Sequence, residues 1–156
     1  MHRRTALISA GTLLSASLAG CSALSGSGEE TPPPPESDAE PVSLVPPAPE
    51  GWERRSKEDG IPGMKSDEAG KGTYANPEVL PFFLSILRWD TVEAAETYAE
   101  DIDRTGFLDA RYAVRRENFL FVCQTAERAS DADAKTLLSH CDSLTESVVE
   151  SHDVMP

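Results

Sequence analysis

The sequence contains little lysine and few basic residues of any kind, and this shortage excludes whole classes of partner. Its 14 Lys and Arg residues are set against 27 Asp and Glu residues, which gives a formal net charge of −13. The lysines are Lys57, Lys65, Lys71 and Lys135. Nucleic acids and anionic lipid head groups are both bound through basic patches. We therefore expect no nucleic-acid partner, and no membrane binding through protein charge.

The chain also lacks the short motifs of common catalytic sites. It contains no nucleophile elbow, no phosphate-binding loop and no Ser-His-Asp set in a familiar order. With only 3 cysteines and no Cys-x-x-Cys spacing, nothing indicates a redox dithiol. We therefore predict no catalytic residue, no cofactor and no metal, and we favour a binding role over an enzymatic one.

The apolar run near the start, Ala6 to Leu18, is shorter than the roughly 20 residues that a membrane-spanning helix needs. It follows Arg3 and Arg4 and ends in small residues, as an export signal does, so residues 1–20 are predicted to be a signal peptide. The arginine pair resembles a twin-arginine signal. The alternative is an ordinary secretory signal in which the two arginines are a generic basic start.

The run ends in Leu18-Ala19-Gly20-Cys21, which resembles a lipobox. The resemblance implies that Cys21 carries lipid and becomes the new N-terminus, and the alternative is cleavage without lipid. Together with the acidic, lysine-poor composition, the leader resembles those of lipoproteins from halophilic archaea. We therefore expect a lipid-anchored protein on the outer side of the cell membrane.

Residues 21–49 are rich in Ser, Gly, Pro and acid. Gly26 to Glu30 is flexible in type, and Pro32 to Pro35 favours an extended polyproline II conformation. Such a segment buries little apolar surface, so it is predicted to be a disordered tether. The alternative is that the proline run docks in the aromatic groove of a partner.

Residues 50–156 are predicted to form one small domain. The pattern indicates strands at 72–75, 81–89, 111–115 and 119–123, and mostly loop over 53–72. An amphipathic helix is expected after a cap at Asp90 and is expected to end at Gly106, and a second is expected from Ser130 to about Val148. This order predicts an α+β fold, a two-layer sandwich of about four antiparallel strands with two helices, ferredoxin-like in style.

The cysteines other than Cys21 form an even pair. Cys123 lies on a predicted strand and Cys141 lies on the apolar stripe of the last helix, so a disulfide between them is predicted. The alternative is two buried free thiols. A copper site of His140, Cys141, His152 and Met155 is rejected, because Cys141 is far from His152 and lies within a helix.

Arg111, Arg115 and Arg116 form a small basic cluster, which is suited either to a carboxylate ligand or to pairing with neighbouring acids. The sequence as a whole favours an anchored module that binds a protein partner or a second copy of itself. The alternative is an enzyme or accessory subunit of the cell envelope, with a site between Trp52 and Tyr74 that carries no recognisable motif.

Overall fold

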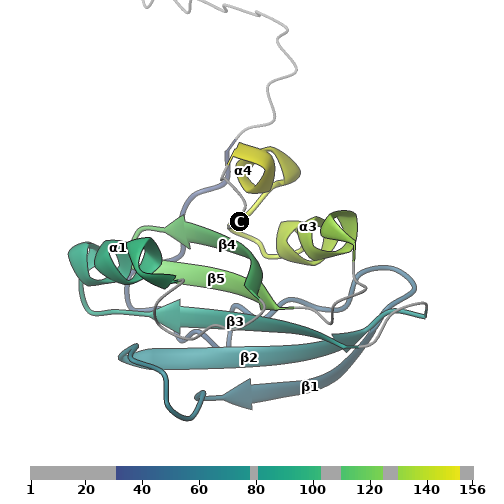
Figure 1. The fold of residues 1–156 in the computed structure, drawn as a ribbon, viewed down its shortest axis with the longest axis horizontal. Coiled ribbons are helices and arrows are strands. Elements are labelled where there is room, and N and C mark those ends of the chain that lie inside the picture. Colours follow the sequence, from purple (N-terminus) through teal and green to yellow (C-terminus); the bar gives the residue numbers. More distant parts are fainter. Residues whose placement is uncertain (1–30, 78–80, 103–109, 125–129, 152–156) are drawn as a thin grey trace, which may run out of the picture.

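The computed structural model describes residues 31–77, 81–102, 110–124 and 130–151. These residues form one antiparallel sheet with helices packed against it (Figure 1). In chain order the elements are β1 (Glu53–Asp59), β2 (Glu68–Ala75), β3 (Phe82–Arg88), α1 (Val92–Glu100), β4 (Ala110–Arg116), β5 (Phe119–Gln124), α3 (Asp131–Ser139) and α4 (Glu146–Ser151). Within these ranges no helix is long and apolar enough to cross a bilayer.

The strand order in the sheet is β1-β2-β3-β5-β4, and every neighbouring pair is antiparallel. The predicted α+β class is confirmed, with five strands in place of about four. β1 was missed because it is an edge strand of charged and polar residues, and all but one of these are exposed. β2 was predicted too short because its glycines are typical of loops.

The connection from β3 to β4 crosses over the sheet. Both strands are antiparallel to β5, which lies between them, so β3 and β4 run in the same direction and α1 lies on the path that joins them. The predicted turn at Arg116-Glu117-Asn118 is confirmed, and Glu117 adopts the left-handed φ of 52° that a tight hairpin needs.

The two faces of the sheet hold separate cores. One face carries the large rings of Tyr74, Phe82 and Phe121 and is covered by residues from α3 and α4. The other carries Leu120 and Val122 and is covered by α1. The helices are therefore divided between two faces, which corrects the two-layer prediction. The reason is the alternation of β5, in which every side chain from Phe119 to Cys123 is buried.

Helix boundaries follow from side-chain caps. Ser130 accepts a hydrogen bond from the Asp133 amide, which confirms the predicted start of α3. At α1 the cap is Thr91, one residue after the predicted Asp90. The predicted last helix is broken into α3 and α4, because Thr145 Oγ1 accepts from the Val148 amide and so starts a new helix. Gly106 lies outside the described residues.

The proline-rich segment differs most from its prediction. Residues 32–49, called the strap from here on, lie against the face that holds α3 and α4, and in Figure 1 their purple-to-blue trace passes behind the strands. Val45 is only 3% exposed within that core. Burying a valine side chain stabilises a fold by about 1.5–3 kcal/mol. The proline- and acid-rich composition of this segment gives no sign of that buried residue. Within residues 32–49, the prediction of a disordered tether is therefore corrected.

Candidate functional site

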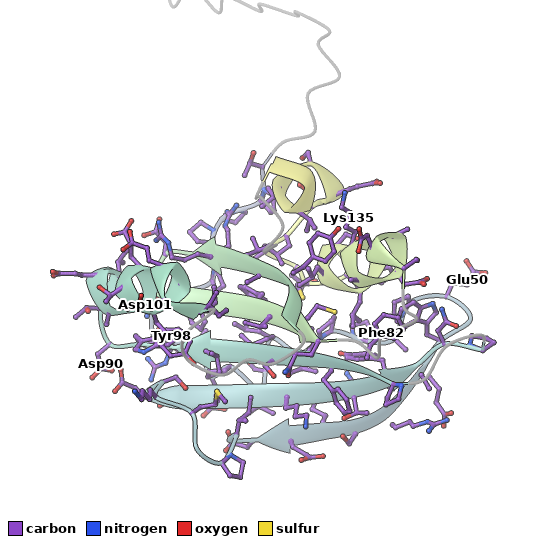
Figure 2. The ribbon with its side chains drawn as sticks, in the orientation of Figure 1. Glu50, Phe82, Asp90, Tyr98, Asp101 and Lys135 are labelled. Atoms are coloured by element: carbon purple, nitrogen blue, oxygen red, sulfur yellow. The ribbon has the colours of Figure 1, made fainter. Side chains whose placement is uncertain are left out.

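A cavity of about 470 Å³ opens at the end of the sheet where β1 turns into β2. Its lining comes from the strap, the ends of both strands and the loop between them: Glu40, Asp59, Gly60, Ile61, Met64, Ser66, Asp67, Glu68 and Ala69. Asp90, at the same end of the sheet as Tyr98, marks this region in Figure 2. The cavity therefore combines four carboxylate side chains with a few apolar ones.

The loop between β1 and β2 is held in a fixed shape. Gly60 and Gly63 have φ values of 77° and 83°, which side chains with a Cβ rarely adopt, so both turns depend on glycine. Trp89 Nε1 donates to the Lys65 carbonyl at 3.1 Å, and the Asp90 amide donates to Asp67 Oδ2 at 2.8 Å. The loop is thus tied to the end of β3, and the cavity is formed in advance of any ligand.

The four carboxylates of the cavity are not equivalent. Asp67 accepts the Asp90 amide, and Glu68 Oε1 is 2.7 Å from Arg88 Nη2, so both have structural partners. Among the described residues, the carboxylates of Glu40 and Asp59 have no ion pair or hydrogen bond. Two uncompensated negative charges beside apolar side chains attract a cation that also carries apolar groups.

Ser66 adds a polar feature to the same lining. Its Oγ is buried and has no hydrogen-bond partner within the described structure. A buried hydroxyl without a partner is unfavourable by about 1–3 kcal/mol, so it is normally satisfied by water or by a ligand. The oxygen is shielded from solvent, so it makes no direct contribution to the binding surface of the cavity.

A second hollow, of about 480 Å³, is lined by residues of α3 and α4. Lys135 and Glu146 bring opposite charges to it, and Lys135 also lies over the Tyr112 ring at 5.9 Å. This hollow has no apolar side chain larger than Ala132 and no excess of one charge. It is therefore less selective than the cavity beside β1 and β2.

Cys123 and Cys141 lie in the same buried core, as predicted, but as free thiols. The predicted disulfide is absent from the structure, and the alternative of two buried thiols describes what is seen. Burial raises the pKa of Cys123 from its usual 9.0 to about 12, and it raises the pKa of Cys141 as well. Protonated thiols of this kind are inert, so they contribute packing.

Of the four residues of the rejected copper site, the structure describes His140 and Cys141. His140 is exposed at the end of α3, where its Nδ1 is 2.8 Å from the Thr136 carbonyl oxygen, while Cys141 is buried. His152 and Met155 lie outside the described residues. In the part of the chain that the structure describes, no group of three or more His, Cys, Asp or Glu side chains is placed to hold a metal ion.

The predicted arginine cluster is divided by the alternation of β4. Arg115 Nη2 lies 3.4 Å from Glu96 on α1, whereas Arg116 Nη2 donates to the Pro32 carbonyl of the strap at 2.6 Å. The side chain of Arg111 lies outside the described set. Arg115 thus pairs with a neighbouring acid, which was one of the two predicted alternatives. Arg115 and Arg116 lie on opposite faces of the sheet, so they do not form one ligand site.

The sequence did not predict the cavity. The region from Trp52 to Tyr74, in which the sequence shows no recognisable motif, contains most of its lining. The only available signal was the pair of turn glycines, Gly60 and Gly63, between acidic residues. Glu40 was beyond reach, because it comes from a segment predicted to be disordered. Arg3, Arg4 and Cys21 lie outside the described residues.

Comparison with family models, with curated proteins and with solved structures finds no match for this chain. The site is therefore interpreted from its own geometry and chemistry.

Proposed function

We propose that this chain is an exported protein, anchored in the outer side of the cell membrane by lipid on Cys21, whose domain binds a positively charged segment of a protein partner. The lipobox-like Leu18-Ala19-Gly20-Cys21 and the basic start at Arg3 and Arg4 support the anchored location. The acidic cavity supports the binding role, and it is the observation that carries the proposal.

The chemistry of the cavity specifies the class of partner. Glu40 and Asp59 provide negative charge without internal partners, and Ile61 and Met64 provide apolar surface beside them. A lysine or arginine side chain offers the complementary combination, because its aliphatic stem packs on apolar groups while its head meets a carboxylate. A cationic peptide segment therefore fits the cavity better than an anion or a purely apolar ligand.

The location is tested by intact mass of the protein extracted from membranes. A mass that begins at Cys21 and includes lipid is expected, and Cys21→Ala is expected to release the protein from the membrane. A mass that includes residue 1 and no lipid would contradict the anchored location, without any bearing on the cavity.

The binding role is tested by calorimetric titration with tetralysine, with tetraglutamate as the comparison peptide. The double change Glu40→Gln and Asp59→Asn is expected to weaken tetralysine binding by roughly two- to thirtyfold, since each exposed ion pair contributes about 0.2–1 kcal/mol. The control is Glu93→Gln with Glu100→Gln, which removes the same charge from the exposed face of α1. Equal weakening in both double variants would mean that only net charge matters, and the proposal would fail.

A further inference from the structure

The strap is held by side chains of the domain that donate to its backbone carbonyls. In its first part, residues 32–40, the carbonyl of Pro32 accepts a hydrogen bond from Arg116 Nη2 at 2.6 Å. Ser37 O accepts from Asn118 Nδ2 at 2.9 Å and from Arg88 Nη1 at 3.3 Å. These bonds lie at the same end of the sheet as the cavity, because Phe119, next to Asn118, pairs with Arg88, and Arg88 pairs with Glu68.

The second part of the strap, residues 41–49, is held more firmly. Pro46 O accepts from Tyr74 Oη and from Arg54 Nη1, both at 2.8 Å, and Val45 is buried in the core. The backbone also passes directly over β2, since a Cβ on Gly70 would lie 2.5 Å from the Val42 nitrogen. Glycine at position 70 is therefore required by the close approach of the strap.

The two parts consequently differ in stability. Residues 33, 34, 36–38 and 40 are exposed, whereas Pro41, Val45, Pro46 and Pro49 are buried. The bonds of the first part also leave two buried polar atoms, Arg88 Nε and Asn118 Oδ1, without a partner in the described structure. A segment with little buried apolar surface and an incompletely satisfied set of bonds opens more readily than its neighbours.

We propose that residues 32–40 release from the domain while residues 41–49 stay bound, and that a cation in the acidic cavity holds them closed. The coupling follows from Glu40, which lies at the boundary between the two parts and contributes to the cavity lining. Release of residues 32–40 withdraws one of the two unpaired carboxylates. A ligand that interacts with Glu40 binds the closed state more tightly and therefore shifts the equilibrium toward it.

Release also changes how far the domain reaches from its anchor, and this consequence rests on the proposed lipid on Cys21. With the strap closed, residues 22–31 connect the anchor to the domain and span at most roughly 35 Å. With residues 32–40 released, the connection spans at most roughly 65 Å. The closed state with ligand bound therefore keeps the cavity end of the domain near the membrane.

Hydrogen exchange measured by mass spectrometry on the full chain carrying Cys21→Ser tests the release. Arg116→Gln removes the bond to Pro32 and is expected to speed exchange in the peptide that covers residues 36–40, where the Ala39 amide donates to Glu36 O at 2.9 Å, by roughly fivefold. The amides of Ser43, Leu44 and Val45 are expected to keep their protection. Arg115→Gln is the matched control, because this neighbouring arginine faces Glu96 on the opposite side of the sheet. Equal exchange in the two variants, or opening of residues 36–45 as one unit, would overturn the two-part strap.

The coupling is tested by repeating the exchange with tetralysine. The peptide is expected to slow exchange of residues 36–40 in the parent chain and to leave it unchanged in Glu40→Gln. Tetralysine that binds by calorimetry without altering this exchange would overturn the coupling. Tetralysine that does not bind at all would overturn the proposed cation site and its coupling, while the comparison of Arg116→Gln with Arg115→Gln would still decide whether the strap opens in two parts.

Discussion

The two faces of the sheet are covered by different means. The α1 face is closed by α1, which contributes Ala95, and by Ile61 and Met64 of the loop between β1 and β2. The opposite face carries Tyr74, Phe82, Phe119 and Phe121, and it needs α3, α4 and the strap together. Figure 2 shows the labelled Phe82 and Tyr98 at opposite ends of the sheet. The strap, which its composition predicts to be a disordered tether, therefore covers part of the face that carries the large aromatic rings.

The largest expected effects on stability come from truncation at two adjacent positions of β5, one on each face. Phe121 and Leu120 are both buried, one on each face. Phe121→Ala is expected to lower the free energy of unfolding by about 3–5 kcal/mol, and Leu120→Ala by about 2–5 kcal/mol. Urea denaturation measures both. A clearly larger loss for Leu120→Ala would mean that the α1 face is the principal core.

The same contrast explains what sequence could predict. β3, β5 and the cap at Ser130 were predictable, because apolar runs and capping residues are local signals. β1 was not, because an edge strand of exposed residues is defined by its hydrogen bonds to β2 and not by its own pattern.

The strap and the cavity were hidden for a different reason. The strap is recognised through its carbonyl groups, which every residue has, by donors such as Arg116 that are distant in sequence. Glu40 joins Asp59 in the lining of one cavity only because the strap packs against the sheet. Contacts between distant residues, made through backbone atoms, leave no periodicity or spacing for sequence analysis to detect.

The buried thiols lie on the strap face alone and give that face a distinctive response to alkali. Below pH 9.0 the Cys123 thiol is protonated in both the folded and the unfolded chain. Between pH 9.0 and a pKa of about 12 only the unfolded chain loses this proton, so the free energy of unfolding falls as the pH rises. The expected slope is about 1.4 kcal/mol per pH unit from this thiol.

Urea midpoints at a series of alkaline pH values measure that slope. Cys123→Ala removes the contribution of this thiol, so its stability is expected to fall less steeply with pH than that of the parent chain. Contributions from groups that the two proteins share cancel in the difference. Parallel slopes for the two proteins would contradict a buried, protonated Cys123.

Asn118 connects the hairpin end of the sheet to the strap, so its loss is expected to have an intermediate effect. Its side-chain amide is 3% exposed and donates to Trp89 O at 2.7 Å and to Ser37 O at 2.9 Å. Asn118→Ala leaves the Trp89 carbonyl without this donor, which is unfavourable by about 1–3 kcal/mol. A loss below about 0.5 kcal/mol in urea denaturation would show that water replaces the amide.

The smallest expected effects come from one ion pair on each face. Glu68 meets Arg88, whose side chain is 13% exposed, at 2.7 Å, whereas Glu96 meets Arg115, which is 33% exposed, at 3.4 Å. Exposed pairs contribute about 0.2–1 kcal/mol, and closer, less exposed pairs lie toward the upper end. Glu68→Gln is therefore expected to lower the free energy of unfolding more than Glu96→Gln.

The losses of stability in Glu68→Gln and in Glu96→Gln are measured by urea denaturation at low and high salt. Salt is expected to reduce the effect of Glu96→Gln more strongly, because a solvated pair is screened more than a partly buried one. Arg88 also donates to Ser37 of the strap, so Glu68→Gln additionally frees one charge beside the point where residues 32–40 are held. An equal loss in the two variants, with equal salt dependence, would mean that the strap gives the Arg88 pair no protection from solvent.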